Sequence, residues 1–108
     1  MTLDIHLAKD QKEAQRISRS ASLELQSHEL IFNRLGFPES KYPLFRRMED
    51  YYQDARYEHS DIQILINEVE EIRTLFKTNP QLYKQLSVIL EVCRKAQEEK
   101  LSIWVFCD

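Results

Sequence analysis

The side chains best suited to bind a metal ion are three histidines, His6, His28 and His59, which lie far apart in the sequence. No two of them have the short spacing that metal-binding motifs use. His28 and Glu29 begin like the helical zinc motif of metalloproteases, but Phe32 occupies the position of its second histidine. The sequence therefore predicts no metal site and no metal cofactor.

The sequence gives equally little support for a catalytic nucleophile or for a nucleotide-binding loop. Cys93 falls on the apolar side of an expected helix, where no nearby cation favours the thiolate. Ser60 and Asp61 directly follow His59, and such residues are expected as caps at the start of a helix. The chain has one glycine, Gly36, so it lacks the glycine-rich loops that let a backbone approach a phosphate. We expect no catalytic residues and no cofactor, and binding is favoured over catalysis.

Tyrosines and one arginine offer a candidate small-molecule pocket. Tyr51 and Tyr52 flank the apolar stripe of a helix expected over 42–57, where tyrosines either line a pocket or cover a core edge. Arg73 lies among apolar positions of the next helix, so it either has a buried carboxylate partner or extends to solvent from the edge of the stripe. With these residues as its pocket, the alternative function is that of a small-molecule- or metal-binding protein, possibly an enzyme. The region around His6 and Cys107 is a second candidate location for the binding site of such a protein.

The two ends of the chain have strand patterns. Residues 3–7 alternate apolar and polar side chains, and residues 101–107 are rich in β-branched and aromatic types. We expect these segments to pair, because an unpaired strand of this kind is prone to aggregate. With the apolar positions toward the core, the residues left on the opposite face are Asp4, His6, Trp104 and Phe106. Aromatic residues bordered by polar groups are typical of contact surfaces, so these four form the candidate interface. The alternative is that the first helix covers them.

Helical periodicity dominates the chain between these two ends. We expect a short helix over 11–20, one from Ser27 to Gly36, one over 42–57, one from Ser60 to Asn79, and one over 80–98. The last is apolar over more than half its circumference, so we place it between another helix and the sheet. Residues 22–26 are either a brief strand or an irregular link. The sequence thus predicts one α+β domain, 1–108, predominantly helical, with four or five helices on a two- or three-stranded sheet that joins the terminal strands.

Composition limits the partners and the compartment. The formal net charge is −3, and the adjacent basic pair Arg46-Arg47 lies among acids, so there is no basic stripe for nucleic acid. No apolar run approaches the ~20 residues of a membrane span, and residues 1–10 do not have the pattern of a signal peptide. With both cysteines taken as reduced thiols, we expect a cytoplasmic protein that binds neither nucleic acid nor membrane.

Three short segments bear on a family. They are Leu3-Asp4-Ile5-His6-Leu7, Asp50-Tyr51-Tyr52-Gln53-Asp54-Ala55, and the closing residues Leu101 to Asp108. They resemble small stand-alone bacterial proteins of unassigned function, some of them immunity-like, and that resemblance implies a protein that acts by binding another protein. Together with the missing catalytic chemistry and the candidate aromatic face, it favours a protein-interaction module, either an inhibitor or immunity-type partner or a homodimer.

Overall fold

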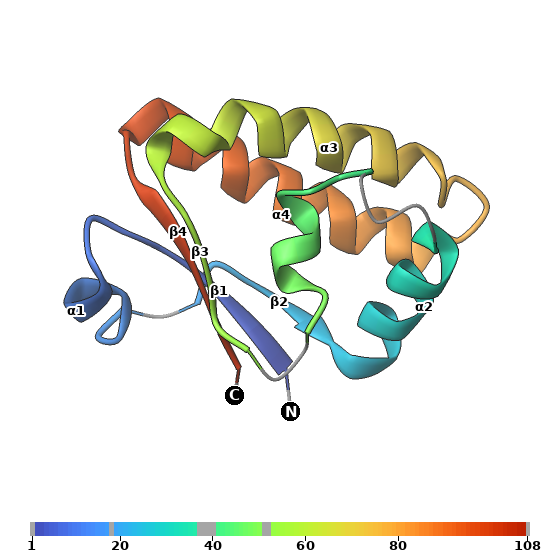
Figure 1. Ribbon diagram of the computed structural model, residues 1–108, viewed down its shortest axis with the longest axis horizontal. Helices are drawn as coiled ribbons and strands as arrows, with labels where there is room; N and C mark the ends of the chain where they lie inside the picture. The colour runs from blue at the N-terminus through green and yellow to red at the C-terminus, as the bar shows by residue number, and fades with distance from the viewer. Residues whose placement is uncertain (1, 18, 37–40, 51–52, 108) are drawn as a thin grey trace.

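A computed structural model describes residues 2–17, 19–36, 41–50 and 53–107 (Figure 1). The strands are β1 (Thr2–Ala8), β2 (Ala21–Glu24), β3 (Ala55–Tyr57) and β4 (Ser102–Cys107). The helices are α1 (Gln11–Ala14), α2 (Leu25–Leu35), α3 (Ile62–Thr74) and α4 (Pro80–Glu99), with the 3₁₀ turns η1 (Phe45–Met48) and η2 (His59–Asp61). The α+β class and the expected number of helices are confirmed.

The sheet is antiparallel, with strand order β2-β1-β4-β3. Its centre is the pairing of the two chain ends, which runs in register from Leu3↔Cys107 to Ala8↔Ser102. This pairing is confirmed, but the expected strand number of two or three is wrong, since the described sheet has four strands. β2 pairs with β1, so 22–24 of the segment left open, 22–26, form a brief strand, whereas 25–26 begin α2. β3 is the other addition, and it pairs with β4.

The helix expected over 42–57 is wrong. Tyr42 has a positive φ of 57°, which a right-handed helix does not allow. In the part of 43–57 that the structure describes, the helical element is the turn η1, which inserts Phe45 and Met48 into the core. Apolar side chains at 42, 45 and 48 repeat every three residues, so a 3₁₀ turn buries them as well as an α-helix would. The end of the segment is β3, where Tyr57 faces the core and Arg56 faces outward.

The two long helices carry the core. α4 lies against α3 on one side and against β2 and β4 on the other, as expected from its wide apolar surface (Figure 1). The N-cap side chain of Asn79 accepts the N–H of Leu82, and Pro80 occupies the first turn, as the sequence predicts. Each helix buries a stripe: Ile62, Leu65, Ile66, Val69 and Ile72 on α3, and Leu82, Leu86, Ile89, Leu90, Cys93 and Ala96 on α4. The described part of the chain contains no helix that combines the length and apolarity needed to cross a membrane.

The helix boundaries differ from expectation at three places. α1 is a single turn, 11–14, and not a helix over 11–20. α2 begins at Leu25, two residues before the expected cap, and Ser27 is a buried residue inside the helix. α3 is preceded by η2, where Glu58 and Asp61 form a capping box in place of the expected Ser60 cap. Gly36 ends α2 with φ 51°, as a C-terminal glycine should.

Candidate functional site

The four residues of the candidate interface do come together on the outer face of the sheet. His6 lies opposite Trp104, and Asp4 lies opposite Phe106, in the β1–β4 register. We expected these residues to be exposed to solvent, but Trp104 is only 8% exposed and His6 only 9%. An aromatic contact surface needs accessible rings, so the expectation that Trp104 is exposed is wrong. Contact of this face with a partner stays a prediction.

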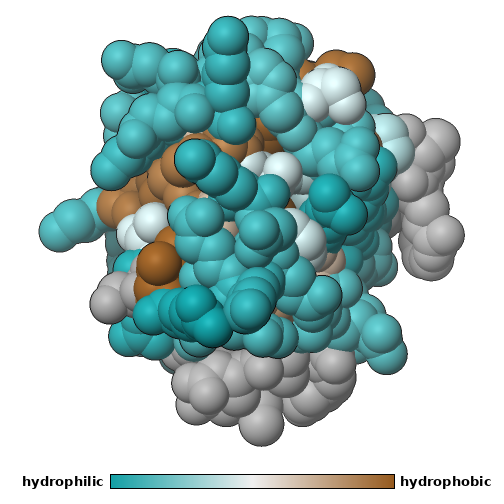
Figure 2. Space-filling model, turned by 90° about the vertical axis from the view of Figure 1, so that its left-hand side faces the viewer, coloured by the Kyte–Doolittle hydropathy of each residue, from teal (hydrophilic) through white to brown (hydrophobic). Residues whose placement is uncertain are grey.

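The first helix covers this face, which was the alternative expectation. Ala14 of α1 and Ala8 of β1 form a second small cluster with Trp104, with Phe106 half-buried against it. The two alanines have small side chains, so α1 can lie close to the sheet. The indole N–H of Trp104 donates to the Ala8 carbonyl at 3.4 Å, and the Arg56 guanidinium stands 4.7 Å from the indole ring. Figure 2 views the molecule from the end that carries α1, and hydrophilic side chains cover most of it.

His6 and Asp4 take different roles under this cover. The Nδ1 atom of His6 is buried without a hydrogen-bond partner, and its ring lies 5.3 Å from that of Phe106. Asp4 accepts from Arg19 at 3.0 Å. Among the described residues, no three His, Cys, Asp or Glu side chains are placed to hold a metal ion. In the candidate His6–Cys107 region, the Cys107 side chain and the neighbouring Asp108 lie outside the described residues.

The described tyrosines between 42 and 57 have structural roles. The Tyr42 hydroxyl donates to Glu71 at 2.9 Å, and the Tyr57 hydroxyl donates to the Leu44 carbonyl at 2.6 Å. Burial raises the pKa of both phenols, and the hydrogen bond to Glu71 adds to the effect at Tyr42. Tyr51 and Tyr52, the two tyrosines of the candidate pocket, lie outside the described residues.

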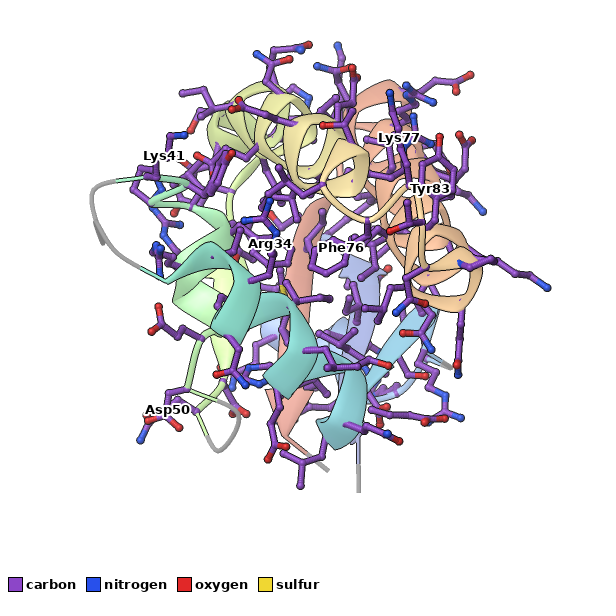
Figure 3. The ribbon with its side chains drawn as sticks, turned by 90° about the vertical axis from the view of Figure 1, so that its right-hand side faces the viewer. Arg34, Lys41, Asp50, Phe76, Lys77 and Tyr83 are labelled. Carbon is purple, nitrogen blue, oxygen red and sulfur yellow. The ribbon has the colours of Figure 1, made fainter. Side chains whose placement is uncertain are left out.

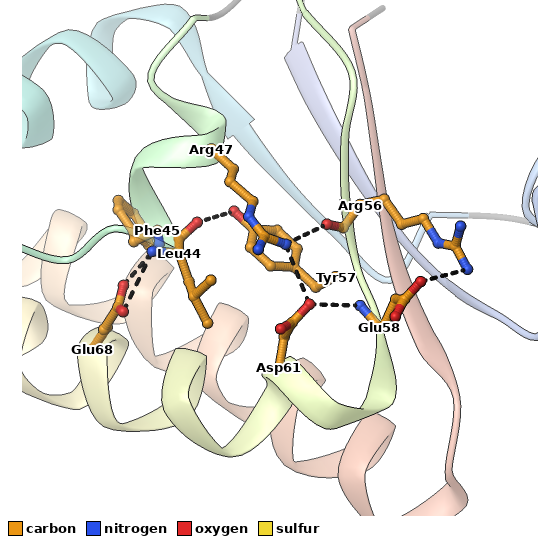
Figure 4. A network of polar contacts seen from close by, with 8 residues as sticks. All are labelled: Leu44, Phe45, Arg47, Arg56, Tyr57, Glu58, Asp61 and Glu68. Carbon is orange, nitrogen blue, oxygen red and sulfur yellow. Dashed lines mark hydrogen bonds and ion pairs between the residues drawn. The ribbon is translucent and has the colours of Figure 1, made fainter.

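Polar contacts tie this segment to α3 (Figure 4). Glu68 is 8% exposed, and its carboxylate accepts the backbone N–H of Phe45 at 2.8 Å and that of Leu44 at 3.4 Å. Arg47 donates to the Arg56 carbonyl at 3.0 Å and to Asp61 at 3.3 Å. Every charge in this network is matched by a backbone or side-chain partner, so the network fixes the fold and has no free group for chemistry. Burial raises the pKa of the Cys93 thiol to about 12, which disfavours the thiolate form.

Arg73 meets a tyrosine, although not one that the sequence singled out. Its guanidinium stands 5.1 Å from the ring of Tyr83 on α4, and its Nη1 donates to the Ser87 hydroxyl at 3.2 Å. Arg73 is half-buried, and its Nε is buried without a hydrogen-bond partner. Tyr83 lines a recess of about 330 Å³ together with Lys77 and Pro80 (Figure 3), which we call the turn recess because it adjoins the α3–α4 turn. Arg73 lines a separate recess of about 390 Å³ with Asn67, Glu70, Glu71 and Thr74. Sequence analysis missed Tyr83 because it follows the apolar pattern of α4.

A larger recess opens on the other side of α4. It has a volume of about 420 Å³ and is lined by Leu7, Ser20, Val88, Glu91, Val92 and Lys95; we call it the α4 recess. Its walls are therefore β1, the chain just before β2, and one face of α4. Val88 is 43% exposed at this recess, whereas Leu7 and Val92 are buried. On the face shown in Figure 2, apolar side chains come to the surface in a hollow between long hydrophilic ones. The only sequence signal for it is the width of the apolar surface of α4.

Comparison of the chain with protein-family models, curated proteins and solved structures found no match. The resemblance to small bacterial proteins stays a prediction.

Proposed function

We propose that the protein is a non-catalytic protein-interaction module that binds its partner at the α4 recess. The observation that carries the proposal is Val88, an apolar side chain that stands 43% exposed over a recess with an apolar floor of Leu7 and Val92. Solvent-facing positions of a helix are usually polar, and a concave site with an apolar lining and a few polar groups is typical of binding sites. A side chain inserted there would gain about 25 cal/mol for each Å² of apolar surface removed from water.

The rim of the recess supports a protein as the ligand. Glu91 and Lys95 stand one helical turn apart on α4, and each also has an exposed partner, Arg94 for Glu91 and Glu99 for Lys95. An apolar centre with an exposed rim of both charges matches the anatomy of protein–protein contacts. The net charge of −3 gives no support to a nucleic-acid partner. A cytoplasmic setting fits the free thiol of Cys93.

The occupant we propose is a segment of a different protein that inserts one or two apolar side chains. A stable homodimer buries about 800 Å² on each partner, with a core-like apolar centre. One exposed valine over a 420 Å³ recess cannot supply that area. A recess of this size does fit the anchor residues by which short segments bind grooves.

The test is a pair of charge substitutions on the two long helices. Val88→Lys places a charge over the recess, and Ile64→Lys makes the same change on α3, where Ile64 is 54% exposed and away from the recess. Neither position is buried, so both variants should fold. A displayed library of random peptides is selected on the native protein. We expect the selected peptides to share an apolar anchor, to lose at least tenfold in affinity for Val88→Lys, and to bind Ile64→Lys normally.

Two results would overturn the proposal. Selected peptides that bind Val88→Lys as tightly as the native protein would show that the recess is not the contact. A dimer in sedimentation that dissociates in Val88→Lys would assign the recess to a second copy of the chain.

A further inference from the structure

We infer, on the basis of the proposed function, that the segment bound at the α4 recess is extended and pairs as a short β-strand with the backbone of Leu7. The segment adds to the sheet beside the end of β1, beyond the point where β2 begins. Its apolar anchor is the residue directly opposite Leu7. The partner is therefore a protein that presents an exposed, extended stretch with one apolar side chain, and not a helix.

The end of β1 has a strand on one side only. On one side β1 pairs with β4 as far as Ala8, whereas on the other side its register with β2 ends at Ile5. Figure 1 shows β1 continuing past the start of β2. Over residues 6–8, therefore, no described strand lies along this edge of β1. Leu7 and Ser20 both line the α4 recess, so the recess opens at this edge.

Hydrogen bonding within the sheet shows which way the Leu7 backbone points. The Ile5 carbonyl accepts the N–H of Ser20, just before β2, at 2.7 Å. In an antiparallel sheet the N–H and C=O of one residue point to the same neighbouring strand, and successive residues alternate between the two neighbours. The backbone of Leu7 therefore points to the β2 side, as that of Ile5 does, and the backbone of His6 points to β4.

The Leu7 backbone lacks a partner on the β2 side. The register gives it no residue of β2, and no described residue before β2 donates to its carbonyl or accepts its N–H. Leu7 is also only 6% exposed, so water replaces little of what is missing. A backbone pair left in this state costs free energy comparable to a lost hydrogen bond, and an added strand would supply both partners.

The opposite edge of the sheet is closed by a side chain. There the Arg56 carbonyl of β3 accepts from Arg47 at 3.0 Å, and the Arg47 guanidinium also lies 5.4 Å from the Tyr57 ring. Covering an edge with a charged side chain is one way in which proteins prevent strand addition. No described side chain takes this role at Leu7, where the α4 recess adjoins the edge instead.

The pairing determines where the side chain of the anchor lies. Residues directly opposite each other in an antiparallel pair have their side chains on the same face of the sheet. The Leu7 side chain belongs to the core, on the face that α4 covers. A residue opposite Leu7 therefore places its side chain in the α4 recess, beside Val88 and Val92, and its two neighbours point to the other face. The recess, about 420 Å³, has room for one large apolar side chain there.

The experiment uses the tightest peptide selected on the native protein, with its anchor located by alanine substitution along the peptide. Three esters of this peptide are made, one in place of the amide N–H of the anchor and one at each neighbour. An ester removes the N–H and keeps the chain extended. We expect the ester at the anchor to weaken binding by roughly five- to thirtyfold, the factor for a buried carbonyl left without its donor. The esters at the two neighbours are the matched controls and should change the affinity less than about twofold, because their N–H groups point away from β1.

Amide exchange measured by NMR gives the same test from the side of the protein. Binding of the peptide should slow exchange of the Leu7 N–H and leave that of His6, which faces β4, unchanged. Strand pairing is overturned if the ester at the anchor costs no more than those at its neighbours, or if exchange at Leu7 is not slowed. Should Val88→Lys still weaken binding at least tenfold in that case, the α4 recess remains the binding site and the proposed function stands. Peptides that bind Val88→Lys normally, or a library that yields no peptide, would overturn both proposals.

Discussion

Replacing Glu68 tests how the segment 42–48 is held to α3. The carboxylate of Glu68 accepts the N–H of Phe45 at 2.8 Å and that of Leu44 at 3.4 Å, in a place that is 8% exposed. A charge-assisted hydrogen bond contributes about 1.5–3 kcal/mol, and a buried N–H without a partner costs about 1–3 kcal/mol. The longer contact to Leu44 contributes less. We therefore expect Glu68→Ala to lower the free energy of unfolding by about 2–4 kcal/mol, and Glu68→Gln, which keeps one acceptor oxygen, by about half as much.

Urea unfolding followed by circular dichroism measures this change. With a slope of roughly 1–3 kcal/mol per M, the midpoint of Glu68→Ala should fall by about 0.7–4 M. The control is Glu70→Ala on the same helix, which removes only a half-exposed ion pair with Arg94 and should cost less than about 1 kcal/mol. If Glu68→Ala and Glu70→Ala shifted the midpoint equally, the carboxylate of Glu68 would not be what fixes η1, and the account of this segment would be refuted.

Two further predictions concern buried aromatic residues. Trp104→Ala should cost about 3–5 kcal/mol in urea unfolding, because the indole lies under α1; a loss below about 1 kcal/mol would mean that the ring is exposed after all. Tyr57→Phe should cost about 1 kcal/mol near neutral pH, since it removes the hydrogen bond to the Leu44 carbonyl. Burial raises the phenol pKa of Tyr57 above its ordinary 10.0, so the folded state holds this proton more tightly than the unfolded chain. The stability of the native protein is therefore lost as pH rises above about 10. Tyr57→Phe should lose less stability over that range, and an identical alkaline loss would contradict the role of Tyr57.

Sequence patterns were sufficient to predict the strands and helices in which a regular pattern or a clear start signal is present. The alternation in 3–7 and the β-branched run in 101–107 predicted the central strand pair, and Asn79-Pro80 predicted the start of α4. The segment 42–57 could not be predicted this way. Its apolar spacing fits an α-helix and a 3₁₀ turn equally well, and the choice depends on Glu68, which is distant in the sequence and accepts its backbone N–H groups. β3 has three residues, too few for an alternating pattern.

The proposed binding surfaces could not be predicted from the sequence, because the exposure of their side chains depends on how the helices and the sheet pack together. The sequence placed Trp104 and Phe106 on the correct face of the sheet, but whether a helix covers that face depends on Ala8 and Ala14 meeting across a turn. Val88 and Leu90 look alike in an apolar helix, and the way α4 packs against α3 and the sheet leaves Val88 exposed and Leu90 buried. The Arg73–Tyr83 contact needs the register between α3 and α4, which the sequence does not specify.

The most direct test of the proposed docking surface is a hydrogen-exchange footprint of the native protein with a peptide that it selects. We predict that the peptide slows exchange in residues 88–95 of α4 and around Leu7 and Ser20, the two sides of the α4 recess. Protection of α1 and of β4 around Trp104, with no change in 88–95, would contradict the account and return the contact to the outer face of the sheet.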